Sequence, residues 1–215
     1  MIKVGEQISN ATVTRLPVYL RHLQLKKQAG LEYISSVTIA EELKLNSVQV
    51  KKDLALVSST GGKPKLGFLI SRLIADIESF LGCDDSQSAI IVGVGKLGSA
   101  LLAHRGFDKY GLKIVAGFDV NPEIVNKSVY GVDIYNFSEM TDFIKANGVK
   151  MAILSVKKDV AQEVVDSLVS AGILAIMNFA PITIKLPQNV LIQNMDIAAS
   201  LAILSTKLKA VLGDK

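Results

Sequence analysis

Two different spacings of apolar residues divide the chain at about residue 82. Ahead of that point, apolar residues recur three and four positions apart, as they do on one face of an α-helix. Beyond it, short unbroken runs of β-branched and aliphatic residues alternate with helical patterns. Alternating strands and helices predict a parallel sheet with right-handed crossovers. We therefore predict a helical domain over residues 1–82, followed by an α/β domain that starts at residue 83.

Four helices are predicted in the first domain. They lie, in chain order, over residues 13–29, after a cap at Ser35-Ser36, after a cap at Ser47, and over residues 69–81. Tyr33-Ile34 is expected to be a short link, and Lys44-Leu45-Asn46 a turn. Two short helices joined by a tight turn are typical of a helix-turn-helix.

The polar residues of this segment suggest a nucleic-acid partner. Residues 58–68 contain three glycines, a proline and two lysines, as expected for a β-wing that lies along a phosphate backbone. We expect the third helix and this wing to contact double-stranded DNA through Ser47, Gln49, Lys51, Lys52, Lys63 and Lys65. The alternative is a helical hairpin that is followed by a solvated loop.

The second domain opens on a strand, a glycine turn and a helix. Residues 89–92 form a short apolar run typical of a strand buried on both faces, and Gly93-x-Gly95-x-x-Gly98 follows directly. In a dinucleotide-binding fold, such glycines permit a tight turn, close approach of the backbone to a pyrophosphate, and packing of helix on strand. The helix that starts there offers free N–H groups to the pyrophosphate.

An acidic residue supports this interpretation. Asp119 ends the next predicted strand, 21 residues past Gly98, where a carboxylate accepts hydrogen bonds from the adenosine ribose. The alternative makes Asp119 a turn residue ahead of Asn121-Pro122. A carboxylate also repels a ribose phosphate, because two unit charges about 4 Å apart cost roughly 4 kcal/mol at an effective dielectric constant near 20. The predicted cofactor is therefore NAD(H) rather than NADP(H).

Further strands are predicted at residues 132–135, 151–156, 173–179 and 190–192, with helices from Ser138 to Asn147 and from Asp159 to Ala171. The residues expected to bind the cofactor are Gly93, Val94, Gly95, Lys96, Leu97, Gly98, Asp119, Val156, Asn178, Phe179, Ala180 and Pro181. Asp196 opens a last helix over residues 197–212, which is apolar on more than one face and so requires a partner. We expect residues 196–215 to join two subunits into a homodimer, which leaves residues 83–195 as the cofactor domain.

Composition limits the classes of protein. Residues 1–82 carry eleven Lys or Arg against seven Asp or Glu, whereas residues 83–215 carry thirteen of each, so the positive excess lies in the helical domain. No apolar run approaches the length of a membrane span, and the N-terminus lacks the apolar core of a signal peptide. The single cysteine, Cys83, excludes an internal disulfide. We expect a cytoplasmic protein.

These residues resemble the Rex family of redox-sensing transcriptional repressors, which join a winged helix to an NAD(H)-binding Rossmann domain. The resemblance extends over nearly the whole chain, from Ala11-Thr12-x-x-Arg15-Leu16-Pro17-x-Tyr19 to residues 195–201. It includes, in family order, Ser35-Ser36, Lys51-Lys52-Asp53, the three glycines, Asp119, Asn178-Phe179-Ala180-Pro181 and Asp196. The joint order and spacing of these motifs make the resemblance specific.

The resemblance implies a homodimer with exchanged C-terminal helices that binds operator DNA when free or NAD⁺-bound and releases it when NADH binds. It implies that Arg15 and Asp196 form a pair joining the two domains, and that Phe179 lies near the nicotinamide. His104 stands where the family has a switch tyrosine, and Lys51 where it has arginine. The wing also differs, with Ser58-Ser59, Lys65 and Phe68 in place of Phe-Gly, glycine and tyrosine.

Two other functions remain open at this point. A small NAD-dependent dehydrogenase would need a proton donor at the nicotinamide. The chain, however, has only His22 and His104 as histidines, no Tyr-x-x-x-Lys pair and no cluster of metal ligands. No catalytic or metal-binding residue is predicted. A regulatory module that binds NAD(H) or coenzyme A without DNA is the other alternative, because related Rossmann domains bind coenzyme A.

Overall fold

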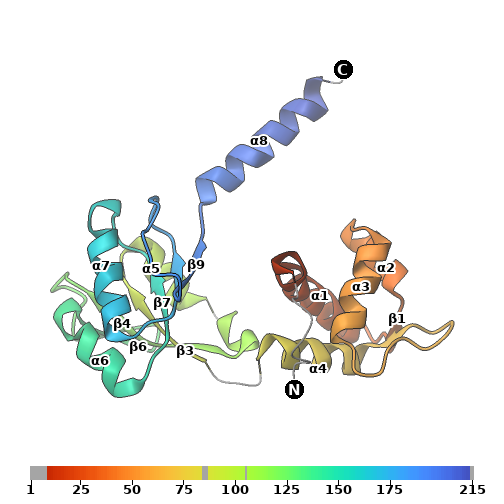
Figure 1. Ribbon diagram of the computed structural model, residues 1–215, viewed down its shortest axis with the longest axis horizontal. Helices are drawn as coiled ribbons and strands as arrows, with labels where there is room; N and C mark the ends of the chain where they lie inside the picture. The colour runs from red at the N-terminus through yellow and green to blue at the C-terminus, as the bar shows by residue number, and fades with distance from the viewer. Residues whose placement is uncertain (1–8, 84–86, 105, 214–215) are drawn as a thin grey trace. The chain divides into compact units, whose positions relative to one another are not determined.

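The computed structural model describes residues 9–83, 87–104 and 106–213, and these form two compact units (Figure 1). One unit holds the chain up to Ser86 together with Lys109–Gly111, and the other holds the rest. The domain boundary predicted after residue 82 is four residues ahead of this division, and positions 84–86 lie outside the described residues. The predicted division of the second unit before Asp196 stays a prediction.

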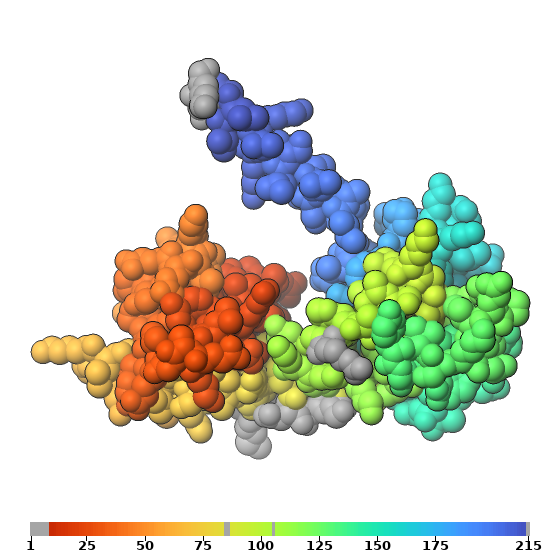
Figure 2. Space-filling view, turned by 180° about the vertical axis from the view of Figure 1, so that it is seen from behind, coloured from red at the N-terminus to blue at the C-terminus, as the bar shows by residue number. Residues whose placement is uncertain are grey.

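The first unit contains four helices and a small antiparallel ladder. The helices are α1 (Asn10–Gln28), α2 (Ser36–Leu43), α3 (Ser47–Val57) and α4 (Ile70–Leu81). The strands are β1 (Tyr33–Ile34) and β2 (Phe68–Leu69), which pair with each other. Tyr33-Ile34 is therefore a strand at the base of the wing, and its prediction as a link was wrong. Figure 2 shows the wing, in yellow-orange, projecting from the helical body of this unit.

The helical periodicity of the sequence produces the core of this unit. α1 packs on α4 and α2 packs on α3, and the buried side chains come from all four helices. The largest fully buried side chains of this unit are Leu16, Tyr19, Leu20, Leu23, Ile39, Leu54, Ile70, Leu73 and Ile77. The N-cap of α3 was predicted at the wrong residue. Asn46 is the cap, because its Oδ1 accepts hydrogen bonds from the Val48 and Gln49 N–H groups at 3.0 and 3.1 Å. Ser47 is the first residue within the helix.

The second unit is a seven-stranded sheet with helices on both faces. Its strands are β3 (Gln87–Val92), β4 (Leu112–Asp119), β5 (Lys127–Val129), β6 (Val132–Asn136), β7 (Met151–Leu154), β8 (Ala175–Asn178) and β9 (Leu191–Asn194). Their order across the sheet is β5-β6-β4-β3-β7-β8-β9, and every neighbouring pair is parallel except β5 with β6. Numbered along the chain, the six parallel strands have the order 3-2-1-4-5-6 of a doubly wound dinucleotide-binding sheet.

The side chains of β3 explain why this strand is uniformly apolar. Ile90 and Val92 point into a core formed with α6 (Met140–Asn147) and α7 (Lys158–Ala171), whereas Ile91 packs on the other face near α5 (Lys96–Ala103). Both faces of β3 are covered, so neither alternate position can be polar. The two 3₁₀ helices are η1 (Phe107–Tyr110) and η2 (Phe137–Glu139).

Two details of this unit differ from the sequence prediction. The helix expected to start after a Ser138 cap begins one residue later, at Met140, because Asn136 and Glu139 form a capping box around η2 and Ser138 lies inside η2. β5 was not predicted at all. The last helix, α8 (Ile197–Gly213), begins as expected after Asp196, whose Oδ1 accepts the Ala199 N–H at 2.8 Å. Every described residue of α8 is exposed.

Candidate nucleotide-binding site and recognition helix

The crevice of this sheet lies at the carboxyl end of β3. Chain connections leave β3 toward β4 on one side, and β7 lies on the other, so the strand order reverses at this point. In open α/β sheets, ligands bind at such a switch point. The glycine turn and the first turn of α5 occupy this end of β3.

Gly93 and Gly98 are required by the geometry of the turn. Gly93 has φ +88°, and a Cβ on it would lie 2.7 Å from the Ser155 carbonyl oxygen. A Cβ on Gly98 would overlap the Gly93 carbonyl oxygen, because α5 packs directly on the turn. Gly95 is different: a Cβ there would meet nothing within 4 Å, so the backbone at this position faces open space. Gly95 is the N-cap of α5 and provides no side chain to cap it, which leaves the first N–H groups of the helix for a ligand.

Ser155 holds the turn in place, and sequence reasoning missed it. Its N–H donates to the Val92 carbonyl at 2.9 Å, and its hydroxyl donates to the Gly93 carbonyl at 2.6 Å. The only signal in the sequence is its position directly after the buried run of β7. Because β7 is the parallel neighbour of β3, the residue that follows one strand reaches the turn that follows the other.

Asp119 also contacts the turn. Its Oδ2 accepts the Val94 N–H at 2.6 Å, and its Oδ1 accepts the Asn121 N–H at 2.9 Å. The bond to the Asn121 N–H is the one expected if Asp119 is a turn residue ahead of Asn121-Pro122, which was the alternative to ribose binding. Each carboxylate oxygen has two lone pairs, so the group can still accept hydrogen bonds from a ligand. Asp119 is half-buried and lines the crevice.

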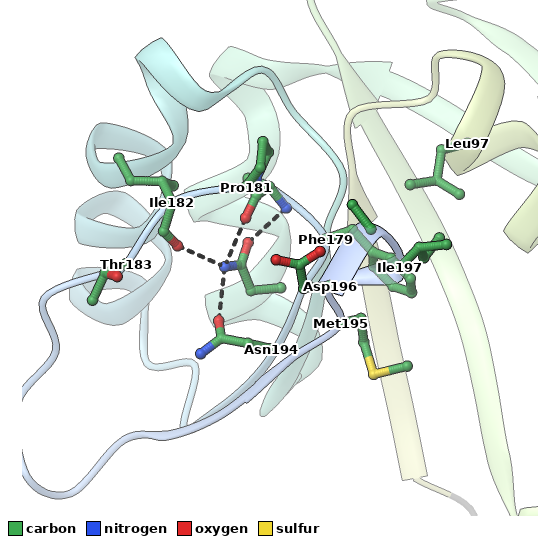
Figure 3. A pocket seen from close by; sticks show the side chains of 12 residues that line it. Leu97, Phe179, Pro181, Ile182, Thr183, Asn194, Met195, Asp196 and Ile197 are labelled. Carbon is green, nitrogen blue, oxygen red and sulfur yellow. Dashed lines mark hydrogen bonds between the residues drawn. The ribbon is translucent and has the colours of Figure 1, made fainter. Parts of the chain in front are cut away.

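Two cavities lie on either side of the α5 N-terminus. The larger, of about 700 Å³, is lined by Gly93, Gly95, Asp119 and Val156 of the predicted set, together with residues that include Phe137, Ser155, Lys157, Val160 and Glu163. The smaller, of about 480 Å³, is shown in Figure 3. Its lining includes Leu97, Asn178, Phe179, Ala180, Pro181 and Asp196 of the predicted residues. Gly95 lines one cavity and Leu97 the other, so the first turn of α5 separates them. Val94 is buried, whereas Lys96 is exposed beside Gly95.

Asn178 supports the wall of the smaller cavity. Its Nδ2 lies within hydrogen-bond distance of the Ala180 and Ile182 carbonyls at 3.2 and 3.3 Å and of Asn194 Oδ1 at 2.9 Å. Its Oδ1 accepts the Ala180 N–H at 2.9 Å. Figure 3 shows these bonds converging on the amide from the 179–182 loop and from β9. The side chain predicted to bind cofactor therefore fixes the loop that carries Phe179 and Pro181.

The residues predicted to contact DNA lie mostly at the surface. Ser47, Lys51 and Lys52 on α3 are exposed, as are Lys63 and Lys65 in the wing. Lys63 Nζ lies 5.8 Å from the centre of the Tyr33 ring, which ties the wing to β1. Gln49 differs from the others because it is only partly exposed and its Nε2 donates to Asp53 Oδ1 at 2.9 Å.

Asp53 is the second functional candidate that sequence reasoning did not assign. Its side chain is fully buried between α1 and α3, where five hydrogen bonds converge on its two oxygens. Arg15 donates from Nε to Oδ2 at 2.6 Å and from Nη2 to Oδ1 at 3.0 Å. Tyr19 OH donates to Oδ2 at 2.8 Å, Thr12 Oγ1 donates to Oδ1 at 3.1 Å, and Gln49 donates as described.

This cluster alters the ionisation of its members. Burial raises the pKa of the Asp53 carboxyl, but the hydrogen bonds from Arg15, Tyr19 and Gln49 together outweigh it, and the pKa lies below its ordinary value. Burial and then the bond to Asp53 raise the pKa of Tyr19 to about 12. The hydrogen bond to Asp53 is the main cause that raises the pKa of Arg15. At neutral pH, Asp53 and Arg15 are therefore both charged, and Tyr19 is neutral.

The predicted switch residues Arg15, His104 and Asp196 each contact residues of their own unit. Arg15 is bound to Asp53 and Asp196 caps α8, so their proposed pairing stays a prediction. His104 is exposed at the end of α5, and its ring lies edge-on to Phe107 at 5.2 Å between ring centres.

Among the described residues, no group of three or more His, Cys, Asp or Glu side chains is placed to hold a metal ion. The helices of the described part of the chain are too short or too polar to cross a membrane.

Two family matches cover different parts of the chain. Residues 84–182 match a family described as "CoA binding domain", and residues 7–55 match one described as "Putative DNA-binding protein N-terminus". The solved structures of RSP, a Rex-family repressor, are 32% identical to this chain. RSP in complex with β-NAD⁺ and operator DNA has a TM-score of 0.88 and is matched over 96% of this chain and 94% of that one. RSP in complex with β-NADH has a TM-score of 0.85 over 96% of each chain.

Whole-chain relatives carry the name of a regulator and not of an enzyme. The redox-sensing transcriptional repressor Rex of Bacteroides fragilis is 36% identical over 206 residues, which are 96% of this chain and 93% of that protein. The Rex repressor of Treponema denticola is 41% identical over 194 residues, 90% of this chain and 91% of that protein. Together with the doubly wound sheet and the helical N-terminal unit, these matches show that the chain belongs to the Rex family of redox-sensing transcriptional repressors.

Proposed function

We propose that this protein is a cytoplasmic repressor that binds operator DNA as a homodimer and releases it when NADH binds. The observation that carries the proposal is the open N-terminus of α5 between two cavities at the switch point of the sheet. A dinucleotide has two halves joined by a pyrophosphate, which matches two cavities separated by one helix N-terminus.

Each part of the cofactor has candidate partners. The backbone at Gly95 and Lys96 would bind the pyrophosphate, and the larger cavity would hold the adenosine half against Asp119 and Val156. The smaller cavity, with Phe179 and Pro181, would hold the nicotinamide half. The nicotinamide supplies the redox state that the protein senses. The chain itself binds and orients the cofactor, and no proton donor for hydride transfer is assigned to it.

Asp119 would determine which nucleotide is accepted. Its carboxylate already binds the Val94 N–H, so a bound ribose would be held by the same group that shapes the glycine turn. A phosphate on the adenosine ribose would meet this negative charge, at a cost of roughly 4 kcal/mol for unit charges about 4 Å apart. NADP(H) and coenzyme A both carry such a phosphate, and NAD(H) does not.

The DNA-binding part of the proposal rests on the exposed cations of the first unit. Lys51 and Lys52 on α3 and Lys63 and Lys65 in the wing would contact phosphates, because lysine acts mainly as a point charge. Dimerisation would use α8, which exposes 66% of Leu201 and 61% of Leu204. Isolated apolar helices of this kind are stable when a partner covers them.

The decisive experiment measures NADH affinity with and without saturating operator DNA. If NADH lowers the affinity for operator DNA a hundredfold, the coupling free energy between the two sites is about 2.7 kcal/mol. Operator DNA must then lower the affinity for NADH by the same factor. Equal NADH affinities in the two conditions would refute the sensor function. The protein would then bind nucleotide and DNA independently.

Coenzyme A is the second candidate ligand, because the family matched by residues 84–182 is described by that name. Titration of the protein with coenzyme A, and competition of coenzyme A against NADH, separates the two ligands. We expect NADH to bind more tightly, because coenzyme A brings a ribose phosphate to Asp119. Tighter binding of coenzyme A would assign the cavities to that ligand.

A further inference from the structure

The first turn of α3 contains a polar side chain whose orientation is fixed from behind. In a helix-turn-helix, residues near the N-terminus of the second helix contact the base edges in the major groove. Gln49 is the third residue of α3, and its Nε2 donates to Asp53 Oδ1 one helical turn away. Gln49 is also partly exposed, so its amide has one buried contact and one accessible side.

Asp53 can form a hydrogen bond with the nitrogen of the Gln49 amide but not with its oxygen. Asp53 is surrounded by donors, and as a carboxylate it accepts hydrogen bonds but donates none. If the Gln49 amide turned over, its oxygen would face the carboxylate oxygen, and two acceptors repel each other. Gln49 must therefore direct an N–H to Asp53. Its Oε1 and its second N–H remain for an outside partner.

We propose that Asp53 is a positioning residue that orients the Gln49 amide to read an adenine in the operator. Adenine presents a donor at N6 and an acceptor at N7 in the major groove, which matches Oε1 and one N–H of a glutamine. Guanine presents two acceptors, so its O6 would face the fixed Oε1 without a proton between them. The inference rests on the proposed binding of operator DNA.

Asp53 is suited to this role because it cannot move with Gln49. It is fully buried, and Arg15, Thr12 and Tyr19 hold it from α1. Gln49 therefore has a rigid partner that belongs to the packing of α1 on α3. A glutamine with no such partner could turn its amide over and direct both N–H groups of Nε2 to guanine O6 and N7, so it would bind either purine.

The test begins with selection of bound sequences from a random duplex pool. Wild type identifies the operator, and Gln49→Ala identifies the base pair at which selectivity is lost. We expect that base to be adenine, preferred by about 5- to 150-fold, the range for one bidentate contact. In a duplex of the selected sequence, an adenine analogue with carbon in place of N7 should weaken wild type and leave Gln49→Ala unchanged. This comparison does not depend on any change to Asp53.

Two variants then separate orientation from folding. Asp53→Asn presents both an N–H donor and a carbonyl acceptor, so the Gln49 amide can bind it in either orientation. The preference for adenine over guanine at that base pair should therefore be lost. Tyr19→Phe removes a hydrogen bond from Oδ2, whereas Gln49 binds Oδ1, so its adenine preference should match wild type. Melting curves and binding to a non-specific duplex confirm that each variant is folded.

The outcomes distinguish this inference from the proposed function. If wild type selects no sequence, operator binding itself fails, and the inference fails with it. If wild type selects an operator but Gln49→Ala has the same preference at every position, only the inference is overturned. Equal loss of preference in Asp53→Asn and Tyr19→Phe would also overturn it, because the effect would then reflect the packing of α1 on α3 and not the amide.

Discussion

Replacement of Arg15 by methionine should destabilise the N-terminal unit strongly at neutral pH. Methionine retains an unbranched apolar stem but removes the cation that Asp53 contacts. Asp53 would remain fully buried with only the neutral donors Thr12, Tyr19 and Gln49. Removing one partner of a buried ion pair costs about 3–5 kcal/mol. The Arg15 side chain is 22% exposed, so water can partly replace it, and we expect a loss of about 3 kcal/mol.

The effect should depend on pH in a definite direction. In wild type the pKa of Asp53 is lowered by folding, so its stabilising contribution is complete above the unfolded value of about 3.9 and is lost as the pH falls through the folded value. Without Arg15, burial is opposed only by neutral donors, and the pKa of folded Asp53 rises above that of wild type. Folded Asp53 in the variant then takes up a proton more readily on acidification. The stability difference between the two proteins should shrink as the pH falls from about 7.5 to about 4, near the unfolded value.

Scanning calorimetry of the full chain at these two pH values measures the difference. For a unit of this size that unfolds in one step, 3 kcal/mol corresponds to a fall in Tm of roughly 12–24 °C. Arg21→Met is the matched control, because Arg21 lies on the same helix and is exposed. Asp53→Asn added to Arg15→Met should recover stability by removing the unpaired charge. An equal fall in Tm at both pH values, or one no larger than for Arg21→Met, would refute the assignment of a buried charged pair.

Four further predictions concern the cofactor, the DNA and the dimer. Gly98→Leu places a side chain where the Gly93 carbonyl oxygen lies, so NADH affinity, measured by fluorescence titration, should fall more than roughly tenfold while operator binding is retained. Release of DNA by NADH in this variant would contradict the placement of NADH at the glycine turn. Asp119→Asn should narrow the preference for NADH over NADPH by at least about tenfold, and an unchanged ratio would remove Asp119 from the ribose site. The double variant Lys51→Ala with Lys52→Ala should flatten the log–log salt dependence of DNA binding by about one unit per lost phosphate contact, and a wild-type slope would refute the orientation of α3. Leu204→Asp should shift sedimentation from dimer to monomer, and a persistent dimer would place the interface outside α8.

The elements with strong local patterns were predictable from the sequence. The four N-terminal helices follow from apolar residues at helical spacing, and all four bury those residues in one core. The strands β3 and β4 were recognised as apolar runs because both their faces are covered. The glycine turn was identified from its spacing, and the overlap at Gly98 gives the physical reason for that spacing.

Boundaries and exposed strands were less predictable. Asn46 and Ser47 are both favourable N-cap residues, and the sequence contains nothing that shows which of them has the extended backbone of a cap. β5 is short and mostly exposed, so it has neither an apolar run nor a clear alternation. β1 has only two residues, and it is a strand only because β2, more than thirty residues later, pairs with it.

The missed site residues depend on contacts across the fold. Asp53 follows two lysines in a helix, a pattern typical of a solvated face, yet its partners on α1 lie 34 to 41 positions earlier. Ser155 reaches the glycine turn from a strand 62 positions later than Gly93. Asp53 belongs to the Lys51-Lys52-Asp53 motif, but that motif does not show its partners, and Ser155 belongs to no motif. Only helix packing or strand order brings each residue to its partner. Asn178 shows the reverse case, because a residue predicted to bind the cofactor has its amide hydrogen-bonded to the loop beside it.

The geometry of Arg15 also bears on its predicted pairing with Asp196. A guanidinium has five N–H donors, and Asp53 occupies the edge formed by Nε and Nη2. Both protons of Nη1 remain, so a second carboxylate can bind Arg15 without displacing Asp53. The two hydrogen bonds to Asp53 also fix the plane of the guanidinium. A second contact would therefore cost less side-chain conformational entropy. The bond to Asp53 within the first unit and a pairing with Asp196 are therefore compatible, and the first would prepare Arg15 for the second.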